Sequence, residues 1–183
     1  GNEPMAMTYR VNAGFIPPES WIQDPEVGGG RILGEVCHFV DYLTFLTGST
    51  PVTVYASAMD DPLNLNDTLS VQVRYSNGSI GIVHYFSNGS KAVSKEYLEV
   101  YQAGTTIQLN DFKEVIISGS KGKPSKRRLV SQDKGQKKML SLVVASLKSH
   151  ILPPISFEDI YDTSLLCFKI LDSLKANTVI NLE

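Results

Sequence analysis

The spacing of hydrophobic and polar residues along the chain changes several times between the period of a strand and that of a helix. Residues 5–12 alternate between the two types, which predicts a β-strand close to the start of the chain. Residues 31–46 carry apolar side chains at intervals of three and four, which predicts an amphipathic helix with one buried stripe. Gly48 follows as a typical C-terminal cap, and Pro51 lies just beyond it.

Short alternating segments dominate the middle of the chain. Period-two patterns predict strands at residues 51–59, 68–75, 80–86, 96–102, 105–109 and 113–118. Between two of them, Ser76-Asn77-Gly78-Ser79 has the Asn-Gly signature of a tight hairpin turn. Short strands joined by tight turns are typical of an antiparallel sheet.

The last third of the chain returns to a helical period. Residues 135–149 form one predicted helix, which ends before a pair of prolines. The next helix begins at Ser156, whose hydroxyl suits an N-cap, and continues to about Ala176, with a short edge strand at 179–180. We therefore expect one α+β domain over residues 1–183, with a mostly antiparallel, open-faced sheet of about six strands and three helices on one face.

Composition and charge restrict the classes of protein and partner. Hydrophobic residues make up 42% of the 183 residues and charged residues 20%, as in globular domains. The net charge of -2 disfavours nucleic acid, because phosphates require a basic surface. No apolar run approaches the roughly 20 residues that span a membrane, and we find no signal peptide, so we expect a cytoplasmic protein without a membrane partner. Cys37 and Cys167 lie far apart in sequence, which fits a reducing compartment.

The candidate chemistry lies at the start of the 31–46 helix. Three glycines, residues 28–30, lead into it, and Glu35, His38 and Asp41 follow at intervals of three, so their side chains would share one flank. The glycines either form a tight turn that needs positive φ or let a ligand approach the free N–H groups of the helix N-terminus. A histidine held there either fills a structural position or transfers protons, because its neutral form is favoured there.

Two further sets of side chains are candidates for substrate contacts. Tyr9, Arg10 and Asn12 lie at the end of the first predicted strand, close in sequence to the glycine turn. They either contact a substrate or only cover the sheet. Trp21, the only tryptophan, lies in a proline-marked loop and is either a pocket wall or a staple that fixes the loop.

The residue types support other chemistries poorly. Glu35 and His38 have the Glu-x-x-His spacing of di-iron bundles, but only three histidines occur and none is paired at ligand spacing, so we expect no metal site. Cys37 and His38 diverge by about 100° on a helix, so a core cysteine is the better interpretation of Cys37. The basic stretch 119–128 lacks the P-loop pattern and is interpreted as a solvated hairpin tip.

Gly-Gly-Gly, a short apolar run, and then His38 and Asp41 three residues apart resemble the helix that opens the C-terminal domain of Gfo/Idh/MocA oxidoreductases. The resemblance extends from residues 9–14 to the helix that begins at 157–159. Residues 34–41 look closest to members sometimes fused to an alcohol-dehydrogenase-like half. One departure is Gly at position 34, where many members have Asp; the neighbouring Glu at 35 would take that part.

The resemblance implies a two-domain enzyme. In that family a Rossmann domain comes first and holds NAD or NADP, and the second domain supplies a catalytic histidine and the substrate pocket. The family's catalytic lysine belongs to the first domain, and the open face of the sheet forms the subunit contact. Because the sequence has no Gly-x-Gly-x-x-Gly fingerprint, we expect residues 1–183 to be only the substrate-binding and oligomerisation domain, with the Rossmann domain upstream in cis.

The sequence therefore predicts part of an NAD(P)-dependent oxidoreductase that acts on a sugar or polyol hydroxyl and is inactive as this chain alone. His38 is the expected proton-transfer residue, with Glu35 and Asp41 as further catalytic candidates. The expected substrate contacts are Tyr9, Arg10, Asn12 and Trp21, and no cofactor-binding residue is assigned.

Two alternatives and an expected assembly remain. Besides the enzyme domain described above, the sequence allows a non-catalytic oligomerisation module, which the Gly34 departure supports. It also allows a sugar-binding module without redox chemistry. The resemblance implies a homo-dimer or tetramer that forms through the sheet.

Overall fold

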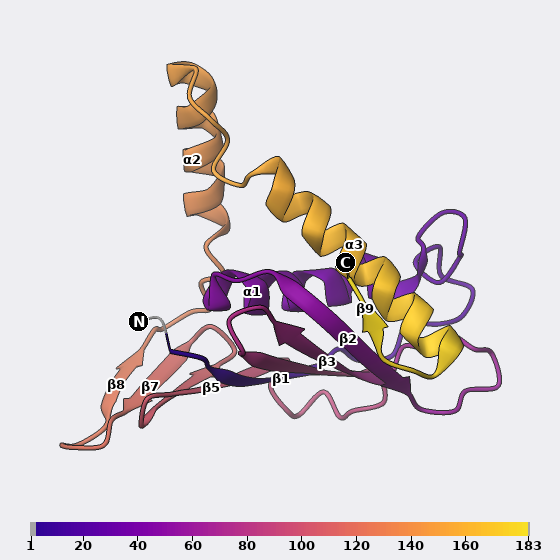
Figure 1. The fold of residues 1–183 in the computed structure, drawn as a ribbon, viewed down its shortest axis with the longest axis horizontal. Coiled ribbons are helices and arrows are strands. Elements are labelled where there is room, and N and C mark those ends of the chain that lie inside the picture. The colour runs from indigo at the N-terminus through magenta and orange to yellow at the C-terminus, as the bar shows by residue number, and fades with distance from the viewer. Residues whose placement is uncertain (1–2, 183) are drawn as a thin grey trace.

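The computed structural model describes residues 3–182, which form a nine-stranded sheet with helices on one face (Figure 1). The sheet order is β8-β7-β6-β5-β1-β4-β3-β2-β9. The strands are β1 Ala6–Asn12, β2 Pro51–Ala58, β3 Leu69–Tyr75, β4 Ile80–Phe86, β5 Glu96–Gln102, β6 Thr105–Asn110, β7 Glu114–Ser118, β8 Ser125–Arg128 and β9 Ile180–Asn181. The predicted α+β class and mostly antiparallel, open-faced sheet are confirmed, with nine strands in place of about six.

The first strand lies in the middle of the sheet. β1 pairs antiparallel with β5 and parallel with β4, so Arg10 lies between Tyr97 and His84. All the other strand pairs between described residues are antiparallel. Part of the 119–128 stretch is itself a strand, since β8 pairs with β7 at the edge of the sheet. An ion pair joins the two strands, with 2.9 Å between Lys126 Nζ and Glu114 Oε2.

Two helices cover one half of the sheet. α1 (Cys37–Thr47) and α3 (Phe157–Ala176) pack on it; α1 ends where predicted, and α3 has both of its predicted ends. Gly48 caps α1 with a φ of 56°, and Ser156 forms a capping box with Asp159 at the start of α3. The helix predicted to begin at residue 31 does begin near that residue, but its residues 32–36 form one turn of π-helix, η1 (Ile32–Val36), before α1.

The core lies between these helices and the central strands. The aromatic rings of Tyr9 and Phe39 meet edge to face, with 5.1 Å between their centroids. Leu43 on α1 and Ile170 on α3 are fully buried. The buried hydrophobic side chains are Met7, Tyr9, Val11, Ile32, Val36, Phe39, Val40, Leu43, Val54, Ala56, Leu69, Val71, Val73, Tyr75, Val83, Tyr85, Leu98, Val100, Leu166, Cys167 and Ile170.

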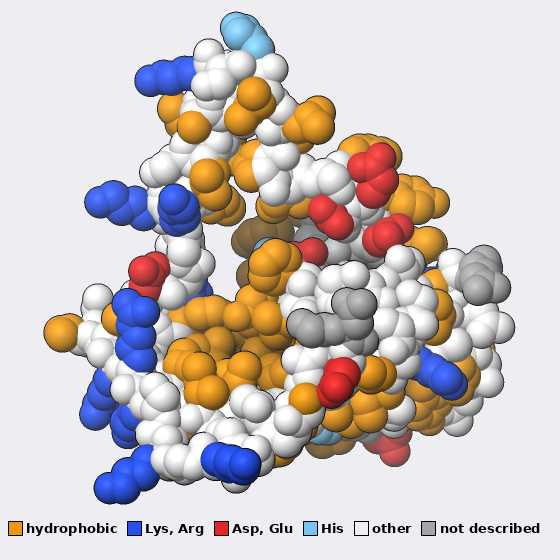
Figure 2. Space-filling model, turned by 60° about the vertical axis from the view of Figure 1, so that its left-hand side comes forward, with side chains coloured by type: hydrophobic (Ala, Val, Ile, Leu, Met, Phe, Trp, Pro, Cys, Tyr) orange, Lys and Arg blue, Asp and Glu red, His pale blue; other side chains and the backbone are white. Residues whose placement is uncertain are grey.

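The other half of the same face has no helix packed on it. α2 (Gln136–Ser149) begins beside this half and projects away from the sheet (Figure 1). Hydrophobic side chains gather in the hollow beneath α2 (Figure 2), where a groove of about 510 Å³ is lined by residues that include Leu98, Ile107 and Leu109. Within residues 3–182, none of the helices is long and apolar enough to cross a membrane.

Candidate active site

The three glycines form a tight backbone turn. Gly28 N–H donates to the Asp24 carbonyl at 2.9 Å, and Gly30 N–H donates to the Ile22 carbonyl at 3.0 Å. Gly29 and Gly30 have φ values of 69° and 77°, and a Cβ added at Gly28 would overlap the Trp21 carbonyl oxygen. The turn interpretation therefore accounts for the glycines without a ligand.

His38 lies in the first turn of α1 and faces a cavity of about 570 Å³ between α1 and α3. Asp41, one turn later, lines the same cavity, and its Oδ1 accepts a hydrogen bond from Thr163 Oγ1 at 2.9 Å. The lining residues are Leu33, Cys37, His38, Asp41, Ile155, Ile160, Thr163, Ser164, Cys167 and Phe168. The structure thus brings His38 and Asp41 together, in walls that are largely apolar.

Glu35 belongs to a different group of side chains. Its Oε1 lies 3.2 Å from Arg31 Nη2 and its Oε2 lies 3.5 Å from Lys95 Nζ. Burial alone would raise the pKa of the Glu35 carboxyl, but the charges of Arg31 and Lys95 outweigh it and lower the pKa. Glu35 is therefore an ionised, paired carboxylate, and it is absent from the residues that line the His38 cavity. Of the three residues expected on one flank, His38 and Asp41 line the cavity, whereas Glu35 is directed to Arg31 and Lys95.

Tyr9 faces the core rather than the His38 cavity. Its hydroxyl donates a hydrogen bond to the carboxylate of Glu96, which also forms an ion pair with Lys134. Burial, together with the Glu96 carboxylate, raises the pKa of the Tyr9 hydroxyl. The tyrosine is therefore neutral and joins β1 to β5.

Arg10 and Asn12 point to the other face of the strand from Tyr9. Arg10 Nη1 donates to the Ser94 carbonyl at 2.7 Å, and its guanidinium lies 6.0 Å from the centroid of the Tyr97 ring. Asn12 Nδ2 donates to the Ser90 carbonyl at 2.8 Å. Both side chains therefore hold the loop that follows β4.

Trp21 lies in the loop before η1, where its side chain is 67% exposed. Neither Trp21 nor the three β1 side chains line the His38 cavity. Their roles as substrate contacts stay predictions.

The two cysteines line the His38 cavity, one on each helix. Burial raises the pKa of the Cys37 thiol, and burial together with Cys37 raises the pKa of Cys167 to about 12. Both therefore carry protons at neutral pH, as core cysteines do. Among residues 3–182, no three or more His, Cys, Asp or Glu side chains form a group that could hold a metal ion.

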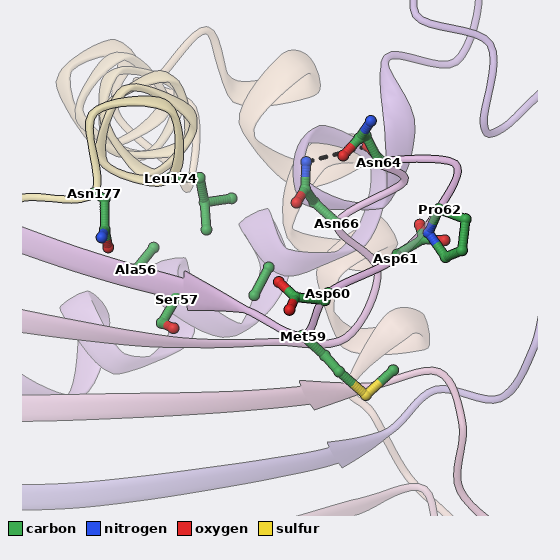
Figure 3. Close-up of a pocket in the computed structure, with 11 residues that line it drawn as sticks. Ala56, Ser57, Met59, Asp60, Asp61, Pro62, Asn64, Asn66, Leu174 and Asn177 are labelled. Carbon is green, nitrogen blue, oxygen red and sulfur yellow. Dashed lines mark hydrogen bonds between the residues drawn. The ribbon is translucent and has the colours of Figure 1, made fainter.

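A second cavity, of about 800 Å³, lies beyond the end of β2, next to the last turns of α3 (Figure 3). Asp60, Asp61, Asn64 and Asn66 form much of its polar wall. The Asp61 carboxylate accepts the Leu65 N–H at 2.7 Å, and Asn66 Nδ2 donates to the Asn64 carbonyl at 3.2 Å. These contacts shape the loop itself and assign no ligand to the cavity.

Residues 3–123 match the family model of the GFO/IDH/MocA C-terminal domain. The chain belongs to this family. The match covers β1 to β7 together with η1 and α1, which carries His38, and it agrees with the resemblance seen in the sequence. Fusion to an alcohol-dehydrogenase-like half has no support in these comparisons. No curated protein sequence matches the chain.

Solved oxidoreductases share the fold of this Gfo/Idh/MocA domain. An oxidoreductase domain protein from Kribbella flavida is 15% identical, with a TM-score of 0.80 over 100% of this chain and 60% of that one. Aldose-aldose oxidoreductase from Caulobacter crescentus, complexed with glycerol, is 15% identical, with a TM-score of 0.80 over 99% of this chain and 57% of that one. Levoglucosan dehydrogenase, in complex with NADH, is 17% identical, with a TM-score of 0.79 over 99% and 58%.

These likenesses establish the fold, and sugar dehydrogenases are among the neighbours. The chain spans about three fifths of the length of the solved structures it matches, so each of them contains a further region without a counterpart here. Residues 3–123 thus form a Gfo/Idh/MocA C-terminal domain by the family match.

Sequence reasoning missed two residues of this region. Thr163 is separated from Asp41 by 122 positions, and no local pattern connects them. Arg31 had a usable signal, because Arg and Glu four residues apart are a typical helical ion pair.

Proposed function

We propose that the intact protein is an NAD(P)-dependent oxidoreductase acting on a sugar or polyol hydroxyl, with this domain as its substrate half. The carrying observation is that His38 faces the 570 Å³ cavity together with Asp41, in walls that are largely apolar. An alcohol carbon releases hydride readily only when its O–H proton is removed, so a base is needed at that oxygen. His38 accepts that proton in the proposed reaction.

NAD or NADP, when bound, supplies the hydride acceptor. No residue of this chain is assigned to its phosphates, because the sequence has no dinucleotide fingerprint. The region of the solved neighbours beyond this chain's span is the proposed source of that site. A domain without its cofactor half is expected to be inactive on its own.

The other polar residues have supporting roles in the proposal. Asp41 orients His38 or fixes α1 to α3 through Thr163. Glu35 lies outside the cavity and is 25% exposed, so it contacts a substrate hydroxyl or acts on His38 through its charge. Trp21 is exposed enough to cover a bound sugar.

Two surfaces suit the proposed protein partners. α2 exposes an apolar stripe that a lone helix of 14 residues cannot stabilise, and we assign it to the upstream Rossmann domain. Its exposed side chains are Met139, Leu140, Leu142, Val143, Val144 and Leu147. The helix-free face of the sheet, which includes Ile80, Tyr55 and Tyr101 as exposed side chains, is the proposed contact with a second copy.

The experiment compares His38→Ala and His38→Asn with wild type in the intact protein, with NAD and NADP and a panel of sugars and polyols. Turnover should be lost while sugar binding is partly kept. His150→Asn is the matched control, because His150 caps α2 with a φ of 51°, which Asn tolerates. Unchanged turnover in the His38 variants would remove His38 from the mechanism.

A sugar-binding or assembly module without redox chemistry is the second candidate. It is favoured by Gly34, since an Asp at that position is part of the family's usual pattern. Sugar binding that is independent of NADH, in an intact protein without turnover, would support this alternative. NADH oxidation or reduction coupled to a sugar would exclude it.

A further inference from the structure

Arg31 carries a charge in the interior of the domain. Its side chain is 1% exposed, and it lies between the glycine turn and η1. Arg31 Nη1 donates to the Gly14 carbonyl at 2.6 Å, and Nη2 donates to Glu35 Oε1 at 3.2 Å. Its guanidinium also lies 5.0 Å from the centroid of the Tyr85 ring on β4. One side chain therefore joins the preceding loop, the π-turn and the sheet.

These three contacts require an arginine. The planar guanidinium donates along its edge to Gly14 and Glu35 while its face stacks on Tyr85. A lysine ammonium could retain the charge, but it could not donate to Gly14 and Glu35 and also stack on the Tyr85 ring. A buried charge persists only where it is paired, so the arrangement fixes Glu35 as well.

The π-turn sets the direction in which α1 begins. The Cys37 N–H donates to the Ile32 carbonyl five residues back, and no side chain caps the turn. A single turn of π-helix is uncommon and depends on its surroundings. Ile32 and Val36 bury its apolar side, and the Arg31–Glu35 pair holds its polar side. His38 follows within two residues, so its approach to the cavity depends on this turn.

We propose that Arg31 is a positioning residue for His38, holding the π-turn in place and keeping Glu35 paired outside the cavity. This inference rests on the proposed function. Without Arg31, η1 can relax to α-helical geometry, which brings Glu35 and His38 onto one flank. Misplacement of a catalytic group by about 1 Å costs on the order of 100-fold in rate.

The test uses the intact enzyme with Arg31→Met, Arg31→Lys and the control Arg128→Met, whose arginine is exposed on β8. We expect Arg31→Met to lower kcat about 100-fold with little change in KM. Arg31→Lys should fall between Arg31→Met and wild type, and the control should match wild type. Amide hydrogen exchange should accelerate over residues 32–38 in Arg31→Met and stay unchanged in α3.

A pH profile separates positioning from general loss of structure. The charged and titratable groups around Glu35 are Arg31, Lys95 and the Tyr85 hydroxyl. Removing Arg31 takes away the main charge that lowers the pKa of Glu35, while Lys95 remains, so any part of the pH profile of kcat that Glu35 controls should move to higher pH. Adding Glu35→Gln to Arg31→Met should remove that movement.

The outcomes distinguish this inference from the proposed function. If Arg31→Met keeps the wild-type kcat and the wild-type amide hydrogen exchange while His38→Ala is inactive, the positioning role of Arg31 is wrong and the proposed function stands. An active His38→Ala would overturn the proposed function first. If Arg31→Met does not fold, Arg31→Lys decides: reduced kcat at constant KM supports the inference, and unchanged kcat contradicts it.

Discussion

Two groups of polar side chains flank the start of α1, and they are built differently. On one side, Arg31, Glu35 and Lys95 form a chain of opposite charges in which the arginine is fully buried. On the other side, His38 faces a mostly apolar cavity with Asp41, which is anchored to α3. The first group satisfies its charges internally, and the second presents an imidazole to a space that a ligand can enter. The difference separates residues that shape the site from the residue proposed to act in it.

The largest expected effect is on the cavity side. His38→Ala should lower kcat by about 10²–10⁴-fold, the usual contribution of a positioned general acid or base. Stability should change little, because the imidazole lines the cavity and is not part of the buried core. Steady-state kinetics and thermal melts of the intact protein check both. A stability loss with unchanged kcat would reverse the roles of the two groups.

Changes to the charged group of Arg31, Glu35 and Lys95 should affect the free energy of unfolding. Arg31→Met should lower the free energy of unfolding by about 1–3 kcal/mol, because it leaves the Gly14 carbonyl without its donor and Glu35 with Lys95 as its remaining partner. Urea unfolding measures the change, with Arg128→Met as the exposed control. A loss below about 1 kcal/mol, the level of a surface pair, would show that the Arg31 charge is not effectively buried.

The contact between the helices should have a smaller effect. Thr163→Val removes the donor to Asp41 and should cost about 0.5–1.5 kcal/mol, the usual net value of one hydrogen bond. A double-mutant cycle with Asp41→Asn isolates the interaction. No coupling between the two changes would mean that Asp41 is held by the helix alone.

The pH dependence of the paired side is the finest test. Glu35 has a folded-state pKa below its ordinary value of 4.5, because Arg31 and Lys95 overcome the effect of burial. Its carboxylate therefore stabilises the folded state above the unfolded pKa, and that contribution is lost as the pH falls through the folded pKa. The stability difference between wild type and Glu35→Gln should be full above about pH 5 and shrink as the pH falls further. A difference that grows on acidification would contradict the pairing.

Much of the fold could be predicted from the sequence because its signals are local. Alternation placed most strands, and the glycine after α1 and the serine before α3 placed helix ends. The parallel pairing of β1 with β4 was beyond such reasoning, because it joins strands that are distant in sequence. Strand β8 was missed because its residues are charged and exposed, and the edge of β7 supplies its pairing.

The candidate site was only partly predictable for the same reason. His38 and Asp41 lie one turn apart in one helix, so periodicity alone placed them together. Glu35 was expected beside them, but it pairs with Arg31 and with Lys95, a residue from a distant part of the chain that no local pattern connects to it. Tyr9 shares its strand with Arg10 and Asn12, yet alternation turns it to the opposite face.

Proton transfer by His38 is tested most directly by chemical rescue of the intact His38→Ala protein with free imidazole, at saturating concentrations of the preferred sugar and nicotinamide cofactor. If His38 accepts the proton, kcat should rise with imidazole concentration, and the rise should follow the neutral form of imidazole as the pH changes. The same additions should leave wild type and His150→Asn unchanged. An inactive His38→Ala protein that binds sugar and cofactor normally but never responds to imidazole would contradict proton transfer at this position.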